Sequence, residues 1–85
     1  MIRIAGEPGE LVWFGGELLE MISAVPLAPG TPTRIQIDDM PLEGKSQGSK
    51  RLDDGRFSVR FRLINLRREH RDRLVALCAT RARRD

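Results

Sequence analysis

The clearest pattern in the chain is a strict alternation of apolar and polar residues over positions 57–63. Successive side chains of a β-strand point to opposite faces, so this alternation predicts a strand with one buried face. Arg60 and Arg62 belong to the opposite face and are expected to point outward. The residues expected to be buried are Phe57, Val59, Phe61 and Leu63.

Shorter patterns of the same kind predict five further strands. Turn residues separate them, such as Gly15-Gly16, Pro29-Gly30 and Asp54-Gly55, where glycine accepts the backbone conformation of a tight turn. The segment 17–24 also fits one face of a helix, but the glycine pair before it and Pro26 after it favour a strand. The predicted strands are 2–4, 11–14, 17–24, 34–38 and 42–52, the last of them bent or bulged around its glycines.

From position 66 the spacing changes to three and four residues, which predicts a helix over 66–80. Asn65 is the expected N-cap, and Glu69 with Arg73 forms a favourable i,i+4 pair. The basic tail 81–85 is expected to fray. The residues that share the apolar side of this helix are Leu66, His70, Leu74, Leu77 and Cys78.

Six short strands followed by one helix indicate an all-β domain, a small six-stranded antiparallel β-barrel with one C-terminal α-helix. The strands occupy about 2–64, and residues 1–85 form a single domain. Closing the sheet into a barrel would remove the exposed edges that so small a sheet cannot otherwise protect.

Charge is distributed unevenly along the chain. Residues 1–44 hold two arginines against seven acids, whereas residues 45–85 hold thirteen basic residues against five acids. This asymmetry favours oriented binding to a charged partner. The single cysteine, Cys78, cannot form an internal disulfide, and the chain shows neither a signal peptide nor an apolar run long enough for a membrane span. We therefore expect a cytoplasmic protein.

The residue types needed for catalysis are scarce, so the sequence does not predict an enzyme. His70 and Cys78 are eight residues apart on one predicted helix, which separates them by about 12 Å along the axis, too far for a hydrogen bond. The acidic pairs 38–39 and 53–54 lie at turns with no further metal ligands at a recognisable spacing, so no metal or other cofactor is expected. The sequence has no glycine-rich phosphate-binding loop ahead of a helix.

From Leu11 to Leu77 the order of features resembles a PilZ domain. A Gly-Gly turn precedes the letters ELLE, and the letters PLAPGT lead into RIQI at 34–37. A polar strand is followed by RFSVRFRL at 56–63, and then by a helix that contains Arg73 and Leu74. The resemblance implies a six-stranded barrel with a C-terminal helix, which is the fold that the residue pattern predicts independently.

PilZ domains typically bind cyclic di-GMP through an RxxxR motif ahead of the barrel and a [D/N]xSxxG motif at its start. Arg3 is the sole basic residue before Arg34, so the first motif is missing. When Gly16 is aligned with the end of the second motif, Leu11 stands at the acidic position and Trp13 at the serine. The chain thus resembles family members that have lost both motifs and act through protein contacts, for example in pilus-based motility.

The sequence therefore predicts a non-catalytic adaptor that binds a protein partner and does not bind cyclic di-GMP alone. Leu11, Trp13 and Phe14 are the candidate partner-binding residues, although Trp13 could equally pack against the barrel. One alternative is a true cyclic di-GMP receptor whose arginines come from elsewhere, for instance Arg3, Arg60 and Arg62, or from a second subunit. Arg60 and Arg62 could equally be ordinary solvated charges. Another alternative is a nucleic-acid-binding barrel, which the scarcity of aromatic residues disfavours.

Overall fold

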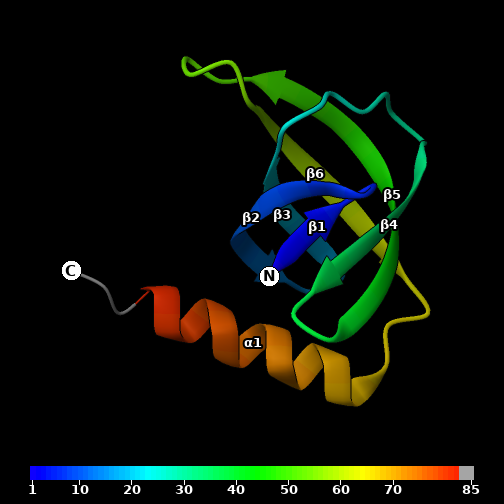
Figure 1. Cartoon of the computed structure of the whole chain (residues 1–85). Helices are drawn as coiled ribbons and strands as arrows, with labels where there is room; N and C mark the ends of the chain where they lie inside the picture. Colours follow the sequence, from blue (N-terminus) through cyan, green and yellow to red (C-terminus); the bar gives the residue numbers. More distant parts are fainter. Residues whose placement is uncertain (83–85) are drawn as a thin grey trace.

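The computed structural model describes residues 1–82, with side chains through residue 78, and contains six strands and one helix (Figure 1). The predicted fold is confirmed: the strands form a closed barrel with the helix at the C-terminal end of the chain. The elements are β1 (Ile2–Ile4), β2 (Glu7–Gly15), β3 (Leu18–Ser23), β4 (Pro32–Ile37), β5 (Met40–Arg51), β6 (Phe57–Ile64) and α1 (Arg68–Ala82).

The barrel consists of two antiparallel meanders, β1-β2-β3 and β4-β5-β6, joined along both of their outer edges. Around the barrel the strand order is β1-β2-β3-β6-β5-β4, so β1 pairs with β4 and β3 pairs with β6. This order places β1 and β6 on opposite sides of the barrel. It also brings β5 and β6, which begin the basic half of the chain, side by side.

Strand β6 follows the alternation that its sequence predicts. Val59 and Phe61 are fully buried and Leu63 is nearly so, whereas Arg60 and Arg62 point outward. The one departure is Phe57, which is only half-buried because it lies at the start of the strand. These side chains join one core with apolar residues from every other strand.

Strand β2 is longer than the predicted 11–14. It begins at Glu7 because a tight turn at Ala5-Gly6 reverses the chain immediately after β1, and both residues have positive φ. Pro8, a residue type that usually interrupts strands, is accommodated at the start of β2 opposite Arg3. Between Leu11 and Trp13 the pairing with β3 shifts by one residue, so Val12 forms a β-bulge.

Strand β5 carries the predicted irregularity, a register shift between Ser46 and Ser49 in its pairing with β6. Earlier in the strand, Gly44 is buried against β6, and a Cβ added there would lie 3.0 Å from the carbonyl oxygen of Arg62. Glycine at this position therefore allows the two strands to lie close together.

Helix α1 lies across one end of the barrel (Figure 1) and buries Leu74 completely. Leu66, Leu77 and Cys78 pack against the core while remaining partly exposed. The helix starts two residues later than predicted. The proposed N-cap is wrong: Asn65 adopts a left-handed conformation with φ 53°, and the carbonyl of Arg67 accepts the first helical hydrogen bond from the amide of Arg71.

Two arginines attach α1 to turns of the barrel. Arg73 donates to Asp39 at 2.9 Å, so it does not form the predicted pair with Glu69, and Arg71 donates to the carbonyl oxygen of Gly16 at 3.3 Å. Of the tail expected to fray, residues 81 and 82 are helical, and residues 83–85 lie outside the described residues.

Candidate functional site

The three residues predicted to contact a partner separate into two groups. Leu11 is 1% exposed and Phe14 is 7% exposed, and both belong to the core. Trp13 is 52% exposed on the outer face of β2. A partner can reach Trp13 but not the other two, so the predicted patch is corrected to Trp13 and the residues around it.

The bulge at Val12 is the reason why Trp13 is exposed. In a regular strand Leu11 and Trp13 would point to the same face, but the extra residue makes Val12 and Trp13 both point outward. Val12 is 41% exposed. Two adjacent apolar side chains thus lie on the outside of a barrel strand, where alternation would normally expose only one.

The indole of Trp13 lies close to Gly15 of its own strand. A Cβ built on Gly15 would come within 2.5 Å of the indole Cζ2 atom and 2.6 Å of Cη2. The ring therefore occupies the space above Gly15, because glycine has no side chain to fill it. Part of the indole is therefore covered by the strand, while about half of the Trp13 surface stays exposed.

Neighbouring strands extend this surface, which we call the Trp13 face. On β3, Leu18 and Ile22 are half-buried and point outward, and Glu20 lies opposite Trp13. Across β6 and β5 the outward residues become basic. The Trp13 face comprises Val12, Trp13, Leu18, Glu20, Ile22, Lys45, Arg60 and Arg62.

The cations of the Trp13 face differ in their partners. Arg60 lies opposite Glu20 in the sheet and donates to its carboxylate at 3.3 Å. Arg62 and Lys45 lie directly opposite each other on β6 and β5, and among the described residues neither has a carboxylate partner. No ion pair within the described part of the chain compensates the positive charge at this end of the face; the next outward residue of β5, Glu43, lies opposite Arg34 on β4.

A separate ion-pair group lies at the turn between β5 and β6. Arg56 bridges Asp54 and Glu10. Hydrogen bonds from Arg56 hold the pKa of Asp54 below its usual range, and hydrogen bonds to Asp54 and Glu10 raise the pKa of Arg56. The charge of Arg56 is thus compensated within the chain, unlike the charges of Arg62 and Lys45.

Arg3 does not join the other two predicted anion contacts. It lies on β1, three strands around the barrel from Arg60 and Arg62 on β6, and donates to the carbonyl oxygen of Gly6 at 3.3 Å. There it lines a hollow of about 400 Å³ together with Arg34. A single small ligand cannot contact Arg3 and the β6 arginines at once.

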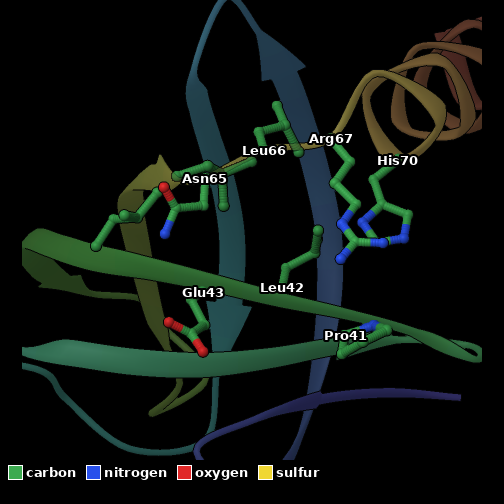
Figure 2. A pocket seen from close by; sticks show the side chains of 9 residues that line it. Pro41, Leu42, Glu43, Asn65, Leu66, Arg67 and His70 are labelled. Atoms are coloured by element: carbon green, nitrogen blue, oxygen red, sulfur yellow. The ribbon is translucent and has the colours of Figure 1, made fainter.

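A second hollow, of about 510 Å³, lies where β5, the end of β6 and the start of α1 meet (Figure 2). In the figure, Glu43 and Asn65 occupy one part of it and Arg67 and His70 another, with Leu66 between them. The described residues that line this hollow include no serine, threonine or cysteine.

Sequence reasoning missed the bulge and the unneutralised Lys45–Arg62 pair. The only signal of the bulge is the apolar run 11–14, since four successive apolar residues cannot all face the interior of a barrel. Lys45 could not be matched to Arg62 before the register of β5 and β6 was known.

Among the described residues, no group of three or more histidine, cysteine, aspartate or glutamate side chains is placed to hold a metal ion. The one described helix is too short and too polar to cross a membrane. Comparisons with family models, with curated proteins and with solved structures give no match for the chain.

Proposed function

We propose that the chain is a PilZ-like, non-catalytic adaptor of the bacterial cytoplasm that binds a protein partner through the Trp13 face. It would act in signalling or motility linked to cyclic di-GMP without binding this nucleotide alone. The observation that carries the proposal is the exposure of Trp13 next to Val12 on the bulge of β2. The PilZ-like assignment rests on the sequence resemblance, whose implied fold is the barrel with one helix that is observed.

Tryptophan is enriched among the residues that dominate binding energy at protein interfaces. Here its indole is held against Gly15, so little conformational freedom is lost when a partner covers it. Closure pairs each strand on both sides over part of its length, which limits the sheet edge to which a partner could add a strand. This favours recognition through side chains, and Trp13 presents an exposed aromatic surface for this purpose.

The geometry gives little support to the receptor alternative. Within one chain it would require Arg3 to act with Arg60 and Arg62, but β1 and β6 lie on opposite sides of the barrel. Arg60 is also engaged by Glu20. In addition, Leu11, at the position that corresponds to the acidic residue of the ligand motif, points into the core.

A calorimetric titration with cyclic di-GMP at physiological salt separates the adaptor from the receptor. We expect no binding in the micromolar range. A dissociation constant near 1 μM would contradict the adaptor proposal and support the receptor, with Arg3, Arg60 and Arg62 as the first residues to substitute.

Affinity capture from an extract of the source cell tests the binding face. Proteins retained by the wild-type domain should be lost with Trp13→Ala. They should remain with Val75→Ala, which removes an equally exposed apolar side chain from α1, where Val75 is 53% exposed. Equal loss with both variants, or with neither, would argue against the Trp13 face.

A further inference from the structure

We propose that the partner presents an acidic segment, with an apolar side chain that covers Trp13 and Leu18 and one or more carboxylates that bind Arg62 and Lys45. This inference rests on the proposed function and adds the chemistry of the partner. It follows from the order of side chains across the Trp13 face and from the charges left without a counterion.

The first observation is the direct opposition of Lys45 and Arg62. Residues opposite each other on neighbouring antiparallel strands have Cβ atoms about 5 Å apart, and like charges in these positions repel. Among the described residues, no acid lies close enough to either side chain to form an ion pair. A carboxylate supplied from outside would relieve this repulsion and gain two charge-assisted hydrogen bonds.

Arg60 provides the contrast within the same strand. It also points outward from β6, but Glu20 of β3 lies opposite it and neutralises its charge. Two residues further along β6, Arg62 lies opposite Leu18 of β3 and opposite Lys45 of β5. The chain thus balances one outward arginine internally and leaves the next one unbalanced beside an apolar side chain.

The second observation is that the apolar and basic parts form one continuous row across the sheet. Gly15 lies opposite Leu18, Leu18 opposite Arg62, and Arg62 opposite Lys45. The indole of Trp13 covers Gly15 at one end of this row. Because neighbouring strands are about 4.8 Å apart, the row runs about 14 Å from Gly15 to Lys45.

That distance defines the segment that fits. An extended peptide advances about 3.3 Å per residue, so its apolar anchor and its acidic residue should be about two to four positions apart. On a helix, side chains three or four positions apart share a face and would reach the same two parts of the row. Both forms expose an apolar residue with Asp or Glu nearby in sequence.

A protein segment fits this face better than a nucleic acid does. The face offers two unneutralised cations, whereas tight nucleic-acid binding typically uses about 6–10 phosphate contacts. The apolar side chains of Val12, Leu18 and Ile22 also have no complement on a phosphate backbone.

The test is to select binders of the whole domain from a displayed library of random dodecapeptides. We then measure the affinities of the selected peptides, synthesised without tryptophan or tyrosine, by intrinsic fluorescence. Trp13 is the only tryptophan and the sequence has no tyrosine, so the emission reports directly on the Trp13 face. The expected peptides carry Asp or Glu two to four positions from a large apolar residue, and their binding shifts the emission to the blue.

Substitutions of the two basic residues test the part of the proposal that concerns charge. The double variant Lys45→Gln/Arg62→Gln should weaken the selected peptides at least about tenfold, because each loses its charge-assisted bonds. The matched double variant Arg34→Gln/Arg68→Gln removes the same charge from exposed positions on β4 and α1, and should leave affinity within about twofold.

Failure of this inference can be distinguished from failure of the proposed function. Two results would contradict an acidic partner while still supporting the Trp13 face as a protein-binding site. The first is that peptides without acidic residues shift the Trp13 emission, and the second is that the selected peptides bind the Lys45→Gln/Arg62→Gln variant with unchanged affinity. Selected peptides that bind Trp13→Ala with unchanged affinity, measured calorimetrically, overturn the face itself. The inference is also overturned if no peptide binds, or if oligo-dT binds with a lower dissociation constant, measured from the emission shift, than any peptide does.

Discussion

Strands β2 and β6 lie in the same barrel but distribute their side chains differently. In β6 the alternation is regular: Phe61 and its apolar neighbours point inward while Arg60 and Arg62 point outward. In β2 the bulge at Val12 interrupts the alternation, and Trp13 is brought to the surface beside it. The outer face of the regular strand is charged, whereas that of the bulged strand carries an aromatic ring.

The comparison shows that, in one small sheet, the residues that stabilise the fold can differ from the residues that contact other molecules. The side chains that β6 turns inward fill the core, so changing them should affect folding. The side chain that the bulge turns outward fills no part of the core, so changing it should affect contacts with other molecules. The substitutions below test this division, beginning with the largest expected effect.

Phe61→Ala should produce the largest loss of stability. Phe61 is fully buried, and truncating a buried phenylalanine costs roughly 3–5 kcal/mol through lost burial and the cavity left behind. Denaturant unfolding followed by circular dichroism measures this loss. Trp13→Ala is the control on β2, with an expected cost below about 1 kcal/mol because the side chain is half exposed. Comparable costs for the two variants would contradict the division.

Gly44→Ala should have the next largest effect. The added methyl group would lie 3.0 Å from the carbonyl oxygen of Arg62 and 3.3 Å from Cβ of Phe61, so β5 and β6 must move apart. Such overpacking costs roughly 1–3 kcal/mol in denaturant unfolding.

The matched variant on β2 is Gly15→Ala, where the three atoms nearest to the new methyl group all belong to the half-exposed indole of Trp13 and none to the backbone. It should cost less than half as much and shift the tryptophan emission. If Gly15→Ala proved the more destabilising of the two, the indole would contribute to stability more than its exposure indicates.

Deleting Val12 should convert β2 into a regular strand with little loss of stability. The residues on both sides of the bulge already pair with successive residues of β3, Leu11 with Met21 and Trp13 with Glu20. After deletion, Leu11 and Phe14 can remain inside, so we expect the free energy of unfolding to stay within about 1 kcal/mol of wild type.

The control deletion is that of Arg60. Deleting Arg60 shifts the residues on one side of the deletion by one position, so their apolar side chains point to the opposite face of the sheet. We expect this variant not to fold. Circular dichroism and thermal melts of the two deletion variants measure both outcomes. An unfolded Val12 deletion would show that the bulge is required for the fold.

The smallest effect concerns the link between α1 and the barrel. A hydrogen bond from Arg73 holds the pKa of Asp39 below its usual range. The pair therefore stabilises the fold at pH values above the ordinary aspartate pKa of about 3.9, and this stabilisation is lost as the pH falls through the lowered pKa. The melting temperature of Asp39→Asn should therefore lie slightly below that of wild type at pH 7, and the difference should shrink at acid pH. In an Arg73→Gln background the same substitution should change nothing at either pH.

Much of the fold could be predicted from the sequence because local pattern and global structure agree. The alternation in β6 specified which side chains are inside, and the turns at Gly30 and Gly55, both with positive φ, were marked by their glycines. The start of β2 was missed because Pro8 and Gly9 usually end strands, while pairing with β1 outweighs that preference here. The helix cap was missed because Asn65 favours a left-handed turn as well as a cap.

The candidate site was only partly predictable. Trp13 was identified from residue type alone, but Leu11 and Phe14 were included with it because an apolar run contains no sign of which residues face inward. The relation of Lys45 to Arg62 depends on strand register across positions that are distant in sequence. Arg3 was grouped with Arg60 and Arg62 on charge, and only the strand order around the barrel separates them.

The way in which the two meanders join also has a consequence for folding kinetics. Each meander is assembled from neighbouring strands, but the barrel closes only when Ile2 meets Ile37 and Leu18 meets Arg62, contacts between residues far apart in the chain. Bringing such distant segments together slows folding, typically to milliseconds or longer for small barrels. We expect closure to limit the rate, and until it occurs β1, β3, β4 and β6 expose edges that can pair with another copy of the chain.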